Sequence, residues 1–343
     1  MNSALKILNE LLAGLDQRQR EVLAGRFGLD KAGKPQTLAA LGSRYKVTRE
    51  RIRQIEVSAL ERLRERIKGN RAASDVLERG EKLLRDAGGV LKQDALLESL
   101  QAAVPGLGMN QLAVLLEASG AFELRAEDRH YRAFYYLDKQ SLKNAENFIS
   151  QWADFLRGKK EHVLSGKYHE HLEDFLRKKG MKPQQAANFL SVSKRVHKNP
   201  YGDIGLAEWT EIRPKTIRDK VYVILKKKKE PLHFRLIADL VNQVFLPRNP
   251  ASAPTVHNEL IKDNRFVLVG RGIYALREQG YEPGTAKDVI QRVLRRHGPL
   301  KPREVVLAVQ RERFFKPNTV LVNLQNKSHF LRLSNGTYQV RES

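Results

Sequence analysis

The clearest pattern of apolar and polar positions lies between Thr37 and Ile67. It predicts a short helix, a tight turn at Tyr45-Lys46, and a longer helix that begins after Thr48, a residue type suited to cap a helix N-terminus. Apolar residues recur at intervals of three and four along one side of the longer helix, at Ile52, Ile55, Ala59, Leu63 and Ile67. The longer helix is therefore expected to be amphipathic.

The residues around the turn have the spacing of a helix-turn-helix. Leu41 and Val47 stand where this motif needs apolar side chains between its helices, and Gly42 stands where a larger side chain would hold them apart. At about 100° per residue, four polar side chains of the second helix face away from the early part of the apolar stripe. These four are Arg49, Glu50, Arg53 and Gln54. We predict that this face enters the major groove of DNA.

Each residue type on this face has a partner among the base edges. Arginine binds guanine through O6 and N7, glutamate accepts a hydrogen bond from cytosine N4, and glutamine pairs with adenine. The alternative is a solvated charged face, which is typical of Arg/Glu runs. The joint presence of turn, small residue, apolar spacing and base-reading types favours direct contact with DNA. Weaker candidates, for phosphate contact, flank the turn at Arg44, Lys46 and Thr48.

Residues 15–30 and 37–67 resemble region 4 of bacterial housekeeping sigma factors, and VTRERIRQIE is close to the pattern of that family. The resemblance covers about residues 10 to 68. It implies that Arg49, Glu50, Arg53 and Gln54 read the minus-35 promoter element and that the segment docks on the flap of the RNA polymerase β subunit. A full sigma factor carries an aromatic-rich, promoter-melting segment before region 4, and nothing of the kind precedes Glu10. We therefore expect a sigma-like protein rather than a stand-alone sigma factor.

The charge of the chain points to a polyanionic partner. The 343 residues include 62 Lys and Arg against 39 Asp and Glu, which leaves a formal net charge of +23. Double-stranded DNA is the leading candidate, and a membrane surface is the rival. No run of 18 apolar residues and no signal-peptide core is present, so we expect no membrane partner. The absence of cysteine excludes disulfides and Cys-ligated zinc and fits a cytoplasmic protein. Because DNA is the expected partner, we expect that protein to be nucleoid-associated.

Two segments after the first motif are expected to be winged-helix-like. Residues 74–138 predict helices at 75–87, 93–103 and 110–119, a Gly88-Gly89 break with a short strand, and a hairpin. Residues 139–214 predict helical cores and a helix at 183–191, followed by a strand at 193–198, a turn and a strand at 203–209. His130 is expected in the first hairpin tip. The histidines at 162, 169 and 171 lack the spacing of a metal site, so no metal is expected.

The last third contains an internal repeat. Residues 255–276 align without a gap on residues 319–340, and six positions are identical, including Phe266 with Phe330 and Tyr274 with Tyr338. Each copy also opens on a capping-box pattern, Thr216 to Asp219 and Thr285 to Asp288. Both copies predict helix, short strand, two helices and a hairpin whose glycine, Gly272 or Gly336, takes a positive φ.

This pattern resembles the HARE helix-turn-helix family, a winged-helix module of polymerase δ subunits, restriction systems and chromatin proteins. The resemblance covers about residues 215–343 and implies an adaptor associated with DNA or polymerase. Lysines at helix ends are open to two interpretations, phosphate contact or solvated helix ends favoured by the helix dipole. The candidates are Lys226, Lys227, Lys228, Lys229, Lys262 and Lys327.

Taken together, the sequence predicts a mainly α fold of tandem helix-turn-helix and winged-helix modules with small β-hairpin wings. The expected modules are 1–70, 74–138, 139–214, 215–278 and 279–343. No catalytic constellation or phosphate-binding loop is visible, so we expect neither an enzyme nor a cofactor. The leading function is a sequence-specific transcription factor that also contacts RNA polymerase core. The alternatives are an architectural DNA binder of low specificity and a polymerase-binding adaptor without DNA readout.

Overall fold

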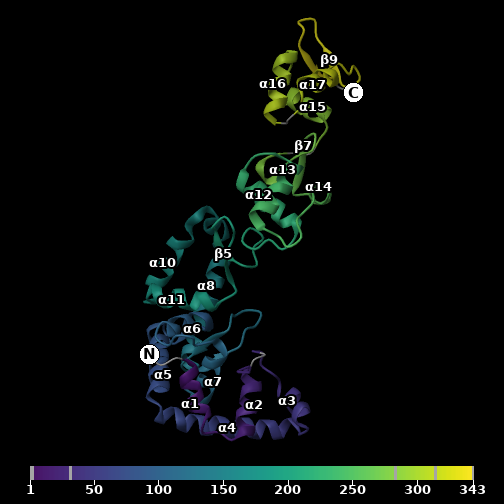
Figure 1. Cartoon of the computed structure of the whole chain (residues 1–343). Coiled ribbons are helices and arrows are strands. Elements are labelled where there is room, and N and C mark those ends of the chain that lie inside the picture. Colours follow the sequence, from purple (N-terminus) through teal and green to yellow (C-terminus); the bar gives the residue numbers. More distant parts are fainter. Residues whose placement is uncertain (1–3, 31–32, 282–283, 313–314, 342–343) are drawn as a thin grey trace. The chain divides into compact units, whose positions relative to one another are not determined.

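The computed structural model describes residues 4–30, 33–281, 284–312 and 315–341. The fold is mainly helical with small antiparallel strand pairs, as the sequence predicted. The chain forms two compact units, which are described one at a time (Figure 1). The N-terminal unit runs to His197 and includes residues 204–207, and the C-terminal unit comprises residues 198–203 and those from Glu208 onward.

The first helices of the N-terminal unit have the bounds that the local sequence dictates. They are α1 (Ala4–Leu12), α2 (Gln17–Phe27), α3 (Leu38–Tyr45), α4 (Arg49–Gly69) and α5 (Arg71–Asp86). Asp16 and Gln19 form a capping box at the start of α2. The predicted helix at 75–87 was placed too late, because Asn70 accepts a hydrogen bond from Ala73 N and starts α5 at Arg71.

The helix-turn-helix is present with its predicted core. Leu41 and Ile52 are fully buried with Val22 of α2. Lys46 ends α3 in the left-handed conformation, with φ of 55°. The chain then turns sharply enough that a Cβ added at Gly42 would lie 2.8 Å from the carbonyl oxygen of Val47. This close approach explains the glycine.

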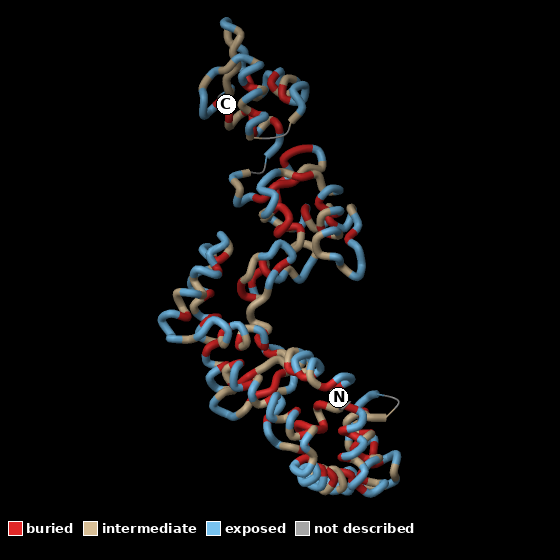
Figure 2. Tube along the Cα trace, turned by 60° about the vertical axis from the view of Figure 1, so that its left-hand side comes forward, coloured by how far each residue is buried: buried red, intermediate tan, exposed pale blue. Residues whose placement is uncertain are grey.

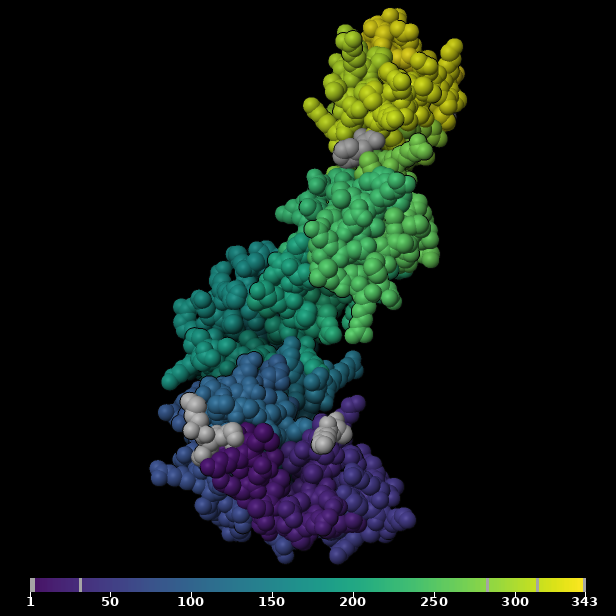
Figure 3. Space-filling view, viewed as in Figure 1, coloured from purple at the N-terminus to yellow at the C-terminus, as the bar shows by residue number. Residues whose placement is uncertain are grey.

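One core joins the first helices to those that follow. The later half of the α4 stripe, Ala59 to Ile67, packs with α1, α5 and the helices α6 (Gln93–Gln101) and α7 (Met109–Ser119). Figure 1 shows α4 running past α2 and α1, from α3 at one end to α5 at the other. In Figure 3 the purple segment of α1 to α4 packs against the blue segments that follow it. In α1, Ile7 is buried in this core, whereas Leu5 is 62% exposed.

A three-stranded antiparallel sheet completes this part of the unit. Its strands are β1 (Val90–Lys92), β2 (Glu123–Arg125) and β3 (Phe134–Tyr136), in the order β1-β3-β2. Every residue of β3 is buried because both faces of the sheet are covered. Tyr135 joins the core under α4, whereas Phe134 and Tyr136 pack with aromatic residues of the next helices. The tip of the hairpin also contacts the following segment, since His130 O accepts a hydrogen bond from Lys194 N at 2.8 Å.

The rest of the N-terminal unit is built on an aromatic core. Its elements are α8 (Lys139–Arg157), α9 (Lys160–His162), a π-helical turn η1 (Val163–Lys167), α10 (Tyr168–Lys179), α11 (Pro183–Val192), β4 (Val196–Lys198) and β5 (Ile204–Leu206). Trp152 and Phe148 are buried against Phe175. Both predicted strands are shorter than expected. Residues 207–209 form a turn instead of extending β5, although Ala207 N still donates to Arg195 O at 2.7 Å.

The C-terminal unit contains the two sequence repeats. The first comprises α12 (Ile217–Lys228), β6 (Leu232–His233), α13 (Phe234–Phe245), α14 (Ala253–Lys262), β7 (Phe266–Gly270), β8 (Ile273–Leu276) and a 3-10 turn η2 (Arg277–Gln279). The second comprises α15 (Ala286–His297), α16 (Pro302–Glu312), α17 (Pro317–Leu324), β9 (Phe330–Arg332) and β10 (Tyr338–Val340). Both predicted capping boxes are present. Figure 2 shows buried positions inside each repeat.

The repeats agree in strand register. Phe266 pairs with Leu276 in the first copy, and Phe330 pairs with Val340 in the second, at a constant offset of 64 residues. Leu232 pairs with Tyr274, and Leu300 makes the matching bridge to Tyr338. The hairpin glycines have φ of 70° and 79°. The sequence alignment therefore corresponds to a structural repeat, whereas the division of the whole chain into five modules stays a prediction.

The close approach at Gly42 generates a stability prediction. Gly42→Ala should lower the free energy of unfolding by about 1–3 kcal/mol, because the added Cβ overlaps a backbone oxygen that cannot move away independently. Gly69→Ala is the control, since nothing lies within 4 Å of a Cβ added there, and it should be neutral or stabilising by up to about 1 kcal/mol. Equal losses in urea unfolding of the two variants would contradict this account of the turn.

Candidate nucleic-acid interface

The candidate interface begins at the N-terminus of α4. Thr48 caps this helix, with its Oγ1 accepting a hydrogen bond from Arg51 N at 3.1 Å. The four residues predicted to read bases, Arg49, Glu50, Arg53 and Gln54, are all exposed. Ile52 between them is fully buried. The helix therefore presents the predicted polar face while its opposite side is fixed in the core.

Two polar contacts organise this face. Arg53 donates from Nη2 to Glu50 Oε1 at 2.8 Å, and Arg51 donates from Nη1 to Gln54 Oε1 at 3.2 Å. Hydrogen bonding from Arg53 holds the pKa of Glu50 below its usual range, so Glu50 is ionised at neutral pH. Both members of the ion pair remain more than half exposed, so the pair contributes little to stability and can be exchanged for contacts with a ligand.

Two cations beside this face were not among the sequence-based candidates. One is Arg51, whose hydrogen bond to Gln54 places its guanidinium beside this face. The guanidinium of Arg18 lies 3.9 Å from the centre of the Tyr45 ring, where it borders the α3–α4 turn. Arg18, Arg51 and Gln54 help to line a shallow hollow of about 250 Å³ between α2 and α4. Arg51 had a sequence signal, three residues before Gln54, but the approach of Arg18 depends on the tertiary fold.

The weaker candidates around the turn differ in their surroundings. Arg44 and Lys46 are exposed, and Arg44 lies 5.4 Å from the centre of the Tyr45 ring. Thr48 already uses its hydroxyl oxygen as a helix cap, so a phosphate contact would use the hydroxyl hydrogen. All three lie on the turn that precedes the exposed face of α4.

The basic C-terminal part of α4 has a structural role. Arg64 donates from Nε to the carbonyl oxygen of Ala118 at 2.8 Å, and Arg66 donates from Nη2 to that of Glu10 at 2.8 Å. Both carbonyls lie near the C-terminal ends of other helices, where cations are favoured. Arg62 donates to the side chain of the buried Gln19. These arginines therefore join α4 to its neighbours.

The lysines at the end of α12 divide into two pairs. Lys226 lies 3.1 Å from Glu211, and Lys227 lies 2.6 Å from Asp203. Partial burial lowers the pKa of Lys226, but hydrogen bonds to Tyr222 and Glu211 outweigh it and raise the pKa above its usual value. Lys228 and Lys229 are exposed beyond them. Charge in the first pair is thus already neutralised within the unit.

The two remaining lysine candidates stand near the ends of the third helices of the repeats. Lys262 is the last residue of α14, and Lys327 follows α17. Both side chains are exposed. Across the described parts of the chain, no cluster of three or more His, Asp or Glu side chains could hold a metal ion. Within the same parts, no helix is long and apolar enough to cross a bilayer.

Comparison with known proteins identifies the first domain. The family model of sigma-70 region 4 matches residues 11–65. RNA polymerase sigma factor SigA of Lactococcus lactis subsp. cremoris is 51% identical over 57 residues, which are 17% of this chain and 15% of the relative. SigA of a Nostoc species is 51% identical over 57 residues, 17% of this chain and 14% of the relative. SigA of Clostridium acetobutylicum is 53% identical over 60 residues, 18% and 15% of the two chains.

These matches confirm the sigma region 4 resemblance and also limit it. The chain spans about 15% of the length of the sigma factors that it matches. The matched residues 11–65 include α2, α3 and most of α4, and with them the exposed polar face. The likeness is therefore to one domain of a sigma factor.

The contact of Arg64 with α7 leads to a prediction that separates structure from phosphate binding. Arg64→Ala should lower the free energy of unfolding by about 1–3 kcal/mol, because a charged donor to a partly buried carbonyl is lost. Affinity for DNA should be unchanged once the protein is folded. Lys68→Ala removes only an exposed pair with Glu65 and should stay within about 0.5 kcal/mol. A loss of DNA affinity in Arg64→Ala without a loss of stability would assign Arg64 to phosphate instead.

Proposed function

We propose that this chain is a DNA-binding transcription factor whose first helix-turn-helix recognises a minus-35-like promoter element. The observation that carries the proposal is the exposed set Arg49, Glu50, Arg53 and Gln54 at the capped start of α4, in a domain that matches sigma region 4. A helix-turn-helix places the N-terminal residues of its second helix against base edges. The fixed apolar side of α4 supplies the rigid support that such readout needs.

The chemistry of each side chain sets its role. Arg49 would bind guanine through two parallel hydrogen bonds, and Gln54 would pair with adenine. Glu50 is ionised and acts only as an acceptor, which suits cytosine N4. Its ion pair with Arg53 is more than half exposed, so both side chains can exchange this contact for contacts with bases.

Contact with RNA polymerase core is the second part of the proposal, through the surface that region 4 uses on the β flap. It is supported by the region 4 match, because this region of sigma factors contacts polymerase as well as DNA. We further propose that the segments after residue 74 are winged-helix modules, the last two of the HARE kind, and that the protein acts in the cytoplasm at the nucleoid without catalytic activity.

Base readout makes a prediction about specificity. Arg49→Ala and Gln54→Ala should each weaken binding to a specific duplex by about 1–3 kcal/mol and leave binding to random duplex nearly unchanged. Lys68→Ala, at the far end of the same helix, is the control and should alter neither. Fluorescence anisotropy with both duplexes measures the ratio. Equal losses on both duplexes would instead indicate an architectural binder that reads only the backbone.

Polymerase binding makes a separate prediction. The full chain should retain RNA polymerase core in a pull-down, and the triple variant Arg49→Ala, Arg53→Ala, Gln54→Ala should still do so, because these side chains face DNA. Retained polymerase together with no affinity of the unaltered chain for any duplex would favour an adaptor without DNA readout. No retention by the unaltered chain would contradict the polymerase part of the proposal.

A further inference from the structure

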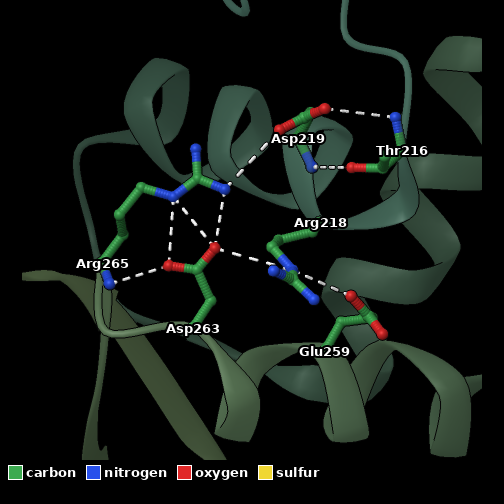
Figure 4. Close-up of polar contacts among 6 residues, drawn as sticks. All are labelled: Thr216, Arg218, Asp219, Glu259, Asp263 and Arg265. Carbon is green, nitrogen blue, oxygen red and sulfur yellow. Dashed lines mark hydrogen bonds and ion pairs between the residues drawn. The ribbon is translucent and has the colours of Figure 1, made fainter.

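In the first C-terminal repeat, a network of ion pairs joins the start of α12 to the end of α14. Asp263 accepts from Arg265 Nη2 at 2.7 Å and lies 3.6 Å from Arg218 Nε, which in turn donates to Glu259 at 2.9 Å (Figure 4). Arg265 also lies 3.6 Å from Asp219 of the capping box. Hydrogen bonding from Arg265 holds the pKa of Asp263 below its usual range. Every cation of this network thus has a carboxylate partner.

The second repeat has the same backbone at this place but different side chains. Arg277 N donates to Arg265 O at 2.8 Å in the first copy, and Arg341 N donates to His329 O at 2.9 Å in the second. This equivalence places Asn323 where the first copy has Glu259, and Lys327 where it has Asp263. The capping boxes align Lys287 with Arg218. The carboxylate of Glu259 is therefore replaced by the amide of Asn323, and that of Asp263 by the cation of Lys327.

One further cation lies beside Lys327, and another is exposed in the same hairpin. Arg341 donates from Nη1 to the carbonyl oxygen of Lys327 at 3.0 Å, which brings the two residues together. Arg332 is exposed at the position where the first copy carries Leu268. Among the described residues, Lys327, Arg332 and Arg341 have no carboxylate partner within ion-pair distance. Other basic groups of this repeat do, since Arg292 and Arg296 both contact Glu312.

We propose that the last repeat binds the phosphate backbone of duplex DNA through the Lys327 surface, formed by Lys287, Lys327, His329, Arg332 and Arg341, and that the first repeat does not use its equivalent surface. Phosphate contact requires cations that are exposed and unneutralised. Lys327, Arg332 and Arg341 are exposed, whereas the first copy has Asp263 and Leu268 at the first two of these positions and an exposed cation, Arg277, only at the third. A protein partner is less suited, because interface cores are depleted in charge and rich in aromatic residues. The inference rests on DNA binding by the chain but on a surface remote in sequence from α4.

The salt dependence of binding tests the Lys327 surface directly. The full chain with Lys327→Ala, Arg332→Ala and Arg341→Ala should bind random duplex with a slope of log affinity against log salt that is smaller by about 2 to 3, since each phosphate contact contributes about 0.9. The matched control is Arg248→Ala, Arg271→Ala and Arg277→Ala in the first repeat, where three exposed cations are also removed. The control should change the slope by less than about 1.

A second variant keeps the test decisive if the alanine variant folds poorly. Asn323→Glu, Lys327→Asp and His329→Arg together transfer the side chains of the first copy to the second. This variant should stay as stable as the parent, because the same backbone holds the same network, and its slope should be smaller by about 1 to 2. An unchanged slope in both second-repeat variants, or equal changes in the control, would overturn the inference.

The outcome is separable from that of base readout. The second-repeat variants should weaken specific and random duplex by the same factor, so the ratio between them is conserved. The proposed readout is tested by whether Arg49→Ala and Gln54→Ala lower the ratio of specific to random affinity. The Lys327 surface is tested by the salt slope on random duplex. A chain without base readout would still show the slope change if the surface binds phosphate.

Discussion

The apolar stripe of α4 is the constraint on which the N-terminal unit depends. Its first part, at Ile52, packs with α2 and α3 and closes the helix-turn-helix. Its later part, at Ala59, Leu63 and Ile67, belongs to the larger core with α1, α5, α6 and α7. A helix that buries one side over its whole length cannot rotate or slide without exposing both cores. The polar side at its N-terminus is therefore held in a fixed direction.

The placement of the cations follows from the same constraint. Near the N-terminus of α4, Arg51 and Arg53 are exposed. Among the described residues, their side chains hydrogen-bond to Gln54 and Glu50. At the packed end, Arg64 and Arg66 satisfy carbonyls of neighbouring helices. The arginines of α4 thus have two roles: those near its N-terminus are exposed, and those near its C-terminus bind neighbouring helices. The position of each arginine along α4 decides its role. The repeats show the same division, with Lys226 and Arg265 neutralised and Lys327 exposed.

Sequence patterns predicted what depends on local spacing. The turn, the cap at Thr48, the burial of Ile52 and the exposure of Arg49 follow from local spacing and residue type, and the repeat alignment predicted a hairpin at the end of each copy. Patterns did not predict what depends on tertiary contacts. Three such features are the start of α5 at Arg71, the coverage of both faces of β3, and the approach of Arg18 to Tyr45. The first depends on where α4 ends and α5 begins, and the other two join segments that are far apart in the sequence. For the same reason, charge alone did not separate Lys226 from Lys327.

Selection of duplexes from a random pool by the intact chain, with and without RNA polymerase core, tests the central claim most directly. If α4 reads bases, the recovered sequences should contain a motif resembling the minus-35 hexamer, and Arg49→Ala should lose it at the position that arginine contacts. Recovery of duplexes without any common motif, both with and without polymerase, would contradict sequence recognition by this face.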